Sequence, residues 1–235
     1  MLDPLPSDFG TTRESLHALA EHVVAPARYH AEHHIGLVPA PGGFGTPTFG
    51  DGERVRVEGT ELVYERPGAS RRVPITTLAD AAQFVGVPLG APTEIYKPTT
   101  ACLPDVMLHV DAESVRVFAA WLDFSAALLR ELCDAYAAHS PSAIQLWPEH
   151  FDLGCTLGDE GAGTRGTYGA APGDGTIAEP YLYVSPWDKD HRTGAFAMYP
   201  FGAAVTYAQL REELDARAAG REFFADGAAL LLGAP

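Results

Sequence analysis

The sequence predicts an α+β protein, with antiparallel strands in one or more sheets and helices packed on one side of them. Three observations lead to this fold class. Residues 54–58 and 61–65 read as strands around a Gly-Thr turn and predict a hairpin. Residues 179–187 and 194–199 predict a second hairpin. The segment after Asp111 repeats apolar residues at helical spacing and predicts the longest helix.

The first third of the chain supplies the remaining elements of one half. Thr11 to Glu14 matches a capping box, so a helix is expected to begin there and to weaken or end at Pro26. Residues 35–38 and 71–75 read as further strands. A short helix capped by Thr77 should stop at Gly86, where a glycine favours termination.

The rest of the chain begins with an extended segment, 87–110, that four prolines keep out of regular structure. Strands are predicted at 143–147 and 151–157, followed by a glycine-rich loop at 158–178 that resembles a lid. A capping box at 206–209 opens the terminal helical region.

The order of elements indicates an internal duplication. Residues 11–86 and 111–232 each run helix, strand, glycine-rich loop, hairpin and helix, although the two halves do not match residue by residue. We therefore predict a single α+β domain over residues 1–235, with these two segments as pseudo-repeats. A groove between such halves is a common place for a ligand.

Composition excludes several classes of partner. The chain has 16 basic and 31 acidic residues, a net charge of −15, which argues against nucleic acid and anionic membranes. No apolar stretch is long enough to span a bilayer, and the first residues do not resemble a signal peptide. The three cysteines are too scattered for a disulfide framework and are expected to be reduced and buried. We predict a cytoplasmic protein.

The stretch AIQLWPEHFDLGCT, residues 143–156, concentrates the reactive side chains. Strand alternation would place His150 and Asp152 on one face, and Pro148 would force a bulge beside them. An Asp can orient a His as a general base, so we predict a catalytic set of Glu149, His150 and Asp152. The competing interpretation is that His150 and Asp152 only satisfy each other and nearby backbone.

A second group of histidines lies at residues 30–34. His33 or His34 could complete a metal site with His150 and Asp152, and zinc or iron would suit such ligands. The competing interpretation is a polar helix end, where cationic histidine complements the helix dipole.

Aromatic residues around the glycine-rich loop predict a ligand-binding wall. Tyr181 and Tyr183 share a strand face, and Trp187 ends the same predicted strand. The predicted ligand-binding residues are Trp147, Tyr168, Asp174, Tyr181, Tyr183 and Trp187.

Four segments resemble an uncharacterised family of bacterial, largely actinobacterial, proteins of unknown function. They are WPEHFD at 147–152, YGAAPGD at 168–174, EPYLYVSPW at 179–187 and PFGA at 200–203. The resemblance covers most of the chain and implies one continuous domain in which the 147–152 segment is important. It implies no particular reaction.

These observations leave three functions open. The first is an enzyme acting on a small molecule through the His, Asp and Glu side chains, with or without a metal. The second is a non-catalytic domain that binds a small molecule in an aromatic-lined cleft. The third is an assembly role for the helix carrying Phe223 and Phe224, against which plain core packing competes. No nucleophile elbow, phosphate loop or dinucleotide fingerprint is present.

Overall fold

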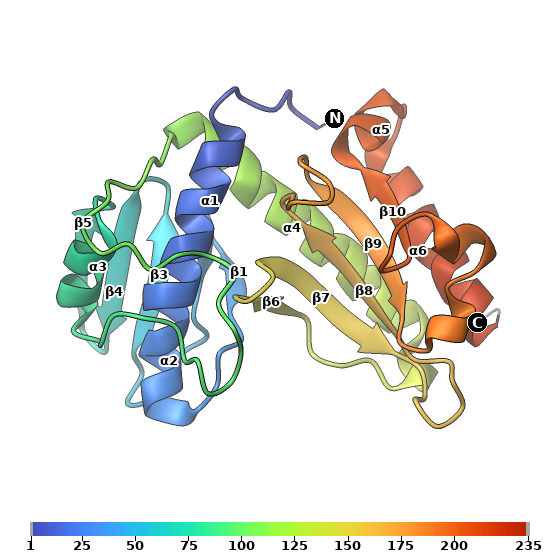
Figure 1. The fold of residues 1–235 in the computed structure, drawn as a ribbon, viewed down its shortest axis with the longest axis horizontal. Helices are drawn as coiled ribbons and strands as arrows, with labels where there is room; N and C mark the ends of the chain where they lie inside the picture. The colour runs from blue at the N-terminus through green and yellow to red at the C-terminus, as the bar shows by residue number, and fades with distance from the viewer. Residues whose placement is uncertain (1, 234–235) are drawn as a thin grey trace. The chain divides into compact units, whose positions relative to one another are not determined.

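A computed structural model describes residues 2–233 and shows two antiparallel sheets of five strands each, together with helices (Figure 1). This confirms the α+β class. The strands of each sheet follow one another in sequence order, β1-β2-β3-β4-β5 in one and β10-β9-β8-β7-β6 in the other. No helix in residues 2–233 is both long and apolar enough to cross a membrane.

The chain divides into two compact units. The N-terminal unit holds Leu5–Ala120 together with the short segment Leu146–Phe151. The C-terminal unit holds Trp121–Gln145 and the chain from Asp152 onward. The N-terminal unit contains the first sheet, and the C-terminal unit contains strands β7 to β10 of the second. Whether the two halves are repeats of one another stays a prediction.

The N-terminal unit begins with one helical run made of α1 (Phe9–Leu19), a π-helical turn η1 (Ala20–Val24) and α2 (Ala25–Glu32). The predicted capping box at Thr11 is wrong, because the helix already starts at Phe9 without a side-chain cap. The expectation that Pro26 ends the helix is also wrong. Pro26 lies in the first turn of α2, after the π turn, where a missing N–H is tolerated.

Five strands and one helix complete this unit: β1 (Val38–Ala40), β2 (Gly43–Gly45), β3 (Arg54–Glu58), β4 (Glu61–Arg66), β5 (Ala69–Pro74) and α3 (Leu78–Val85). The hairpin of β3 and β4 and the start of α3 at its Thr77 cap confirm the prediction. The strand expected at 35–38 is mostly absent, since only Val38 belongs to β1.

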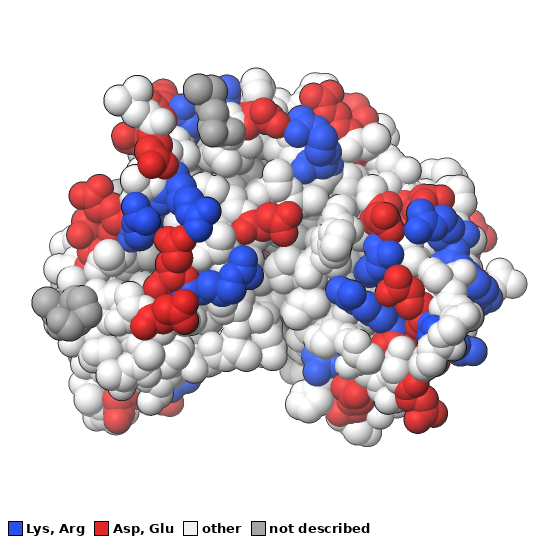
Figure 2. Space-filling model, turned by 180° about the vertical axis from the view of Figure 1, so that it is seen from behind, with Lys and Arg blue, Asp and Glu red and all other residues white. Residues whose placement is uncertain are grey.

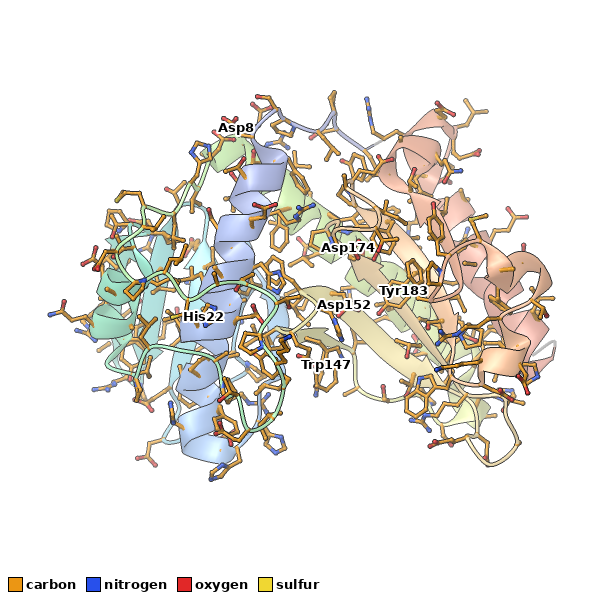
Figure 3. All side chains as sticks on the ribbon, viewed as in Figure 1. Asp8, His22, Trp147, Asp152, Asp174 and Tyr183 are labelled. Carbon is orange, nitrogen blue, oxygen red and sulfur yellow. The ribbon has the colours of Figure 1, made fainter. Side chains whose placement is uncertain are left out.

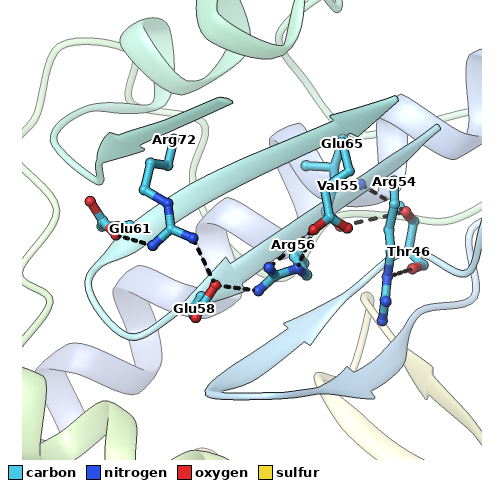
Figure 4. Close-up of polar contacts among 8 residues, drawn as sticks. All are labelled: Thr46, Arg54, Val55, Arg56, Glu58, Glu61, Glu65 and Arg72. Atoms are coloured by element: carbon cyan, nitrogen blue, oxygen red, sulfur yellow. Dashed lines mark hydrogen bonds and ion pairs between the residues drawn. The ribbon is translucent and has the colours of Figure 1, made fainter. Parts of the chain in front are cut away.

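Alternation along β3 buries Val55 and Val57 and leaves Arg54 and Arg56, which alternate with them, half-buried on the other face. There Arg56 bonds Glu58 and Glu65, and Arg72 reaches Glu58 and Glu61 (Figure 4). Figure 2 likewise shows acidic and basic side chains next to one another on the face it displays. Arg72 is largely exposed and Arg56 half-buried, and the carboxylates that they bind stay partly open to solvent. We therefore expect these ion pairs to contribute little to stability.

The helix α4 (Ala112–Ala135) begins at a cap in which the Ser114 amide donates to the Asp111 carboxylate, as predicted. It contributes its first residues to the N-terminal unit and the rest, from Trp121, to the C-terminal unit. The remaining elements are η2 (Ala137–His139), β6 (Gln145–Trp147), β7 (Asp152–Leu157), β8 (Gly166–Ala171), β9 (Tyr181–Pro186), η3 (Lys189–His191), η4 (Gly194–Ala197), β10 (Ala203–Thr206), α5 (Tyr207–Glu212) and α6 (Ala216–Leu232).

Two expectations for this half are corrected. Residues 158–178 are not one loop, because β8 runs through them and pairs with both β7 and β9. Residues 194–199 do not form the partner of β9. They fold into the 3₁₀ turn η4, which opens at Gly194 with a φ of 56°, and β10 pairs with β9 instead.

The helices α4 and α6 cover one face of the C-terminal sheet. Gly220 and Gly227 let α6 approach Leu182 and Val184 of β9, since an added Cβ would lie 3.1 and 2.8 Å from those side chains. The side chains that alternate with Leu182 and Val184 project from the opposite face. Figure 1 shows α4 behind the strands and this second face toward the viewer.

Candidate functional site

The opposite face of the C-terminal sheet, which we call the tyrosine face, carries most of its polar and aromatic side chains. Cross-strand register aligns Gly154 with Gly169 and Gly169 with Tyr183, and the same face continues one step along the strands to Thr167 and Ser185. The face is made of Asp152, Gly154, Thr156, Thr167, Gly169, Ala171, Tyr181, Tyr183, Ser185 and Ala204.

Tyr183 of β9 reaches Asp152 of β7 across the intervening strand. Its hydroxyl donates a hydrogen bond to Asp152 Oδ2, and both side chains are buried. The ring can lie over β8 because position 169 is glycine: a Cβ there would stand 2.6 Å from the Tyr183 ring and hydroxyl. Gly154 extends the same bare strip, with an added Cβ 3.4 Å from the hydroxyl.

A second tyrosine–carboxylate pair lies beside the first. The Tyr181 hydroxyl donates to Asp174 Oδ2, while Asp174 Oδ1 accepts from the amides of Thr176 and Ile177. Tyr181 stacks on Phe201, with ring centroids 5.8 Å apart. Four residues predicted from the sequence therefore meet on this face: Asp152, Asp174, Tyr181 and Tyr183. Figure 3 labels three of them, Asp152, Asp174 and Tyr183.

Burial keeps both hydroxyls protonated. Desolvation raises the pKa of Tyr183 well above its ordinary value, and the neighbouring Asp152 carboxylate raises it further. Desolvation likewise raises the pKa of Tyr181, with Asp174 adding to the effect. Both tyrosines are therefore hydrogen-bond donors at neutral pH, and neither is poised to act as a base.

A pocket of about 510 Å³ opens farther along this sheet. Thr167 and Ser185 of the tyrosine face contribute to it, and the chain on either side supplies charged and aromatic side chains. It is lined by Glu160, Gly163, Arg165, Thr167, Ser185, Trp187, Asp188 and Arg192. Its size suits a small metabolite, for which pockets of about 300–1,000 Å³ are typical.

Arg165 and Trp187 form one wall of the pocket. The Arg165 guanidinium lies over the indole, 4.9 Å from the ring centroid, and the indole N–H donates to Thr167 Oγ1 at 2.9 Å. Arg165 donates to Thr156 Oγ1 at 2.7 Å and to the carbonyl oxygen of Gly158 at 3.4 Å. Trp187 nevertheless remains 44% exposed, so it is available to a ligand.

Arg192 is fixed in a similar way, by donating to the carbonyl oxygens of Pro186 and Pro200 at 3.2 and 2.8 Å. The acceptors of both Arg165 and Arg192 are neutral oxygens. Within residues 2–233, neither guanidinium has a carboxylate within 4 Å. Two positive charges are thus held rigidly at one pocket without an anionic partner.

Tyr168 and Trp187 were both predicted to bind a ligand, but only Trp187 lies at the pocket. Tyr168 projects from the helix-covered face, is fully buried and packs edge-to-face on Phe224 of α6. Desolvation raises the pKa of Tyr168. The structure therefore does not bring Tyr168 to the other predicted ligand-binding residues.

The predicted catalytic set of Glu149, His150 and Asp152 assumed that one strand runs through His150 and Asp152. The backbone does not form a strand there before Asp152. Phe151 has a φ of 53° and β7 starts only at Asp152, so His150 lies in the preceding turn. His150 is exposed and Glu149 half-buried, and both belong to the N-terminal unit, as does the exposed Trp147. The argument that puts His150 and Asp152 on one face is therefore wrong, while their catalytic role stays a prediction.

The predicted metal ligands are not gathered together. His33 and His34 are exposed, and His33 ends α2 in the left-handed region with its ring edge-on to Tyr29. Across residues 2–233, no three His, Cys, Asp or Glu side chains form a group that could hold a metal ion. The zinc or iron hypothesis, which needs His33 or His34 with His150 and Asp152, gains no support from this arrangement.

Sequence reasoning missed a buried polar cluster in the N-terminal unit. Glu21, in the π turn, is 0% exposed. It accepts hydrogen bonds from the amide and hydroxyl of Thr99 and from those of Thr100, at 2.5–3.4 Å. Four donors satisfy a buried carboxylate, so Glu21 anchors the extended 87–110 segment to the helix.

His22 anchors the same segment at a second point. The Ala91 amide donates to His22 Nδ1 at 3.2 Å, so that nitrogen is an acceptor and the proton of a neutral ring sits on Nε2. Nε2 lies 3.2 Å from the carbonyl oxygen of Thr100. A π turn is unusual and often marks a functional site, but it is a feature of the backbone, and no residue pattern in this sequence indicates it. The periodic apolar pattern of the helix concealed it.

His17 ties the helix to the 147–151 turn. Its Nε2 lies 2.8 Å from the carbonyl oxygen of Pro148, and its ring stacks on Phe151 with the planes 7° apart. Burial lowers the pKa of His17, although the Glu21 carboxylate 3.8 Å away opposes that shift. These contacts give His17, Glu21 and His22 a structural role: they fix two segments that have little regular structure of their own.

No family model, curated protein or solved structure matches the chain. The resemblance to an actinobacterial family stays a hypothesis, and the candidate site rests on its own geometry.

Proposed function

We propose that the protein binds a small molecule carrying a single anionic group, a carboxylate or a phosphate monoester, in the pocket of the C-terminal unit. This is the binding-domain hypothesis, with Trp187 as the aromatic wall. The observation that carries it is the pair of arginines, Arg165 and Arg192, which line one pocket and bond only neutral oxygens.

The physical argument concerns charge. A guanidinium gains most from bidentate hydrogen bonds to a carboxylate or phosphate, and a preorganised one loses little side-chain entropy on binding. Neutral acceptors orient Arg165 and Arg192 without neutralising them. The exposed indole of Trp187 adds a flat apolar surface against which a ring can pack.

Glu160 and Asp188 also line the pocket and restrict the ligand. Their negative charge, added to a net charge of −15, opposes polyanions such as nucleoside triphosphates. One anionic group placed between the arginines avoids most of this repulsion. The favoured ligand is therefore a small aromatic or cyclic acid or phosphate monoester.

Calorimetric titration tests the proposal. A panel of carboxylates and phosphate monoesters is compared with neutral amides and alcohols of the same shape, and binding is expected only for the anions. Arg192→Gln should weaken binding at least about tenfold, because a charge-assisted hydrogen bond contributes about 1.5–3 kcal/mol.

Arg130→Gln is the matched control, since Arg130 is exposed on α4 and does not line the pocket. It removes the same charge and should leave the affinity unchanged. Equal effects of the two substitutions, or no binding by any anion in the panel, would overturn the proposal.

Catalysis on the same face is a second candidate function. Asp152, one of the predicted catalytic residues, projects from the tyrosine face and is hydrogen-bonded to Tyr183. If a bound ligand is converted, Asp152→Asn should abolish turnover without weakening binding, as judged by product analysis beside calorimetry. Unchanged turnover in that variant would remove Asp152 from the mechanism.

We also infer a cytoplasmic location. The three cysteines are free thiols, which suits a reducing compartment. Fractionation of cells expressing the tagged full-length protein would test this.

A further inference from the structure

Two of the three cysteines lie next to each other in the C-terminal unit. Cys133 is near the end of α4, and Cys155 lies in the middle of β7 on the helix-covered face. Their sulfur atoms are 3.5 Å apart, joined by a thiol–thiol hydrogen bond. Twenty-two residues separate them along the chain, so their proximity arises from the packing of α4 on the sheet.

The two thiols are not equivalent. Cys133 is half-buried and open to small reagents, whereas Cys155 is 2% exposed and enclosed. The hydrogen bond between the two thiols lowers the pKa of Cys133, while the same bond and burial raise the pKa of Cys155. A thiolate is the reactive form of cysteine, so Cys133 is the thiol that meets an oxidant first.

We propose that Cys133 and Cys155 form a reversible disulfide when the protein meets a hydroperoxide, with Cys133 as the attacking thiol and Cys155 as the resolving one. The site is independent of the anion pocket. Cys102, which was expected to be buried, is exposed; it belongs to the N-terminal unit and takes no part in the reaction.

The chemistry balances in two steps. The Cys133 thiol first loses its proton, and the thiolate attacks one oxygen of hydrogen peroxide. The O–O bond breaks, and the departing hydroxide combines with the released proton to form water, leaving a sulfenic acid on Cys133. The Cys155 sulfur then attacks the sulfenic sulfur, its proton joins the leaving hydroxide, and a second water is released. One peroxide is reduced, and two thiols are oxidised to one disulfide.

The geometry supports closure of the ring. Sulfur atoms at van der Waals distance need to move about 1.5 Å to reach the length of a disulfide bond. The end of α4 near Cys133 is followed by the short turn η2 (Ala137–His139), whereas β7 is held on both sides by hydrogen-bonded strands. We therefore expect the side chain and last turn of α4 to move, and β7 to stay in place.

The test treats the purified full-length protein with an equimolar amount of hydrogen peroxide and counts free thiols after denaturation. The count should fall from three to one, the intact mass should fall by about 2 Da, and dithiothreitol should reverse both changes. Peptide mapping should find the Cys133–Cys155 cross-link.

Substitutions distinguish the steps. In Cys155→Ser the reaction should stop at a sulfenic acid on Cys133, which a dimedone probe captures. Cys133→Ser should form neither the sulfenic acid nor the disulfide. Cys102→Ser is the matched control and should still form the disulfide. Retention of all three thiols in the unmodified protein, or a cross-link that requires Cys102, would overturn the proposal. The first of these outcomes is read on the unmodified protein, so a folding defect in a variant does not obscure it.

Discussion

The Tyr183 hydroxyl donates its hydrogen bond to Asp152 across a strand that has glycine, Gly169, directly beneath the ring. Gly169 makes this possible, because a Cβ there would stand 2.6 Å from the tyrosine, and its neighbour Gly154 on β7 leaves the hydroxyl an ordinary contact distance of 3.4 Å from an added Cβ. The bond joins β9 to β7 without involving the backbone of β8 in the contact.

Gly169→Ala should therefore destabilise the C-terminal unit. The added methyl group would lie 2.6 Å from the Tyr183 ring, so the ring must move and its bond to Asp152 must lengthen or break. Overpacking of this kind costs about 1–3 kcal/mol, which urea denaturation can measure. Gly175→Ala is the control, because nothing lies within 4 Å of a Cβ at that position. Equal stability of the two variants would contradict the account of the glycine strip.

Glu21→Gln should loosen the 87–110 segment. The amide can no longer accept from all four donors of Thr99 and Thr100, and its NH₂ group faces at least one of them. We expect a loss of roughly 2–4 kcal/mol in the free energy of unfolding and faster hydrogen exchange at the two threonine amides. Glu14→Gln, at an exposed position on α1, should change neither quantity. Unaltered exchange in Glu21→Gln would show that the carboxylate does not anchor the segment.

Stability should fall with decreasing pH because of His17. Burial lowers its pKa in the folded protein below the ordinary value of 6.5, so the unfolded chain takes up the proton first as the pH falls. The neutral ring thus stabilises the fold above about pH 6.5, and this contribution declines as the pH falls toward the folded pKa, by at most about 1.4 kcal/mol per pH unit.

Urea denaturation between pH 7.5 and pH 5 measures this dependence. In His17→Gln the slope should be smaller by up to one proton, while His34→Gln, which replaces an exposed histidine, should keep the parental slope. If His17→Gln retained the full slope, protonation of His17 would not be its source.

Local signals in the sequence predicted the local features well. The Gly59-Thr60 hairpin, the Thr77 and Asp111 caps and the capping box at Thr206 all depend on residues within a few positions of one another, and the structure has each of them. Period-two alternation also placed Tyr181 and Tyr183 on one face. These interactions form between neighbours in the chain, so their sequence patterns carry most of the information. The capping box expected at Thr11 is the exception, because the helix already starts at Phe9.

The features that the sequence did not reveal depend on distant residues or on unusual backbone. The partnership of Asp152 with Tyr183 requires the strand order β7-β8-β9 and a glycine in the middle strand. Arg165 and Arg192 come from irregular segments with no periodicity to connect them. His150 was misplaced because Phe151 adopts a left-handed φ that aromatic residues rarely take.

The π turn at Ala20–Val24 has a consequence for comparing this chain with others. A π turn holds one residue more than an α turn, so every position from Ala25 to Glu32 is out of phase by one with a regular helix that starts at Phe9. An alignment to a relative with an unbroken α-helix would need a one-residue gap between Leu19 and Ala25. Without that gap, the core-facing side chains of α2 would be paired with surface positions.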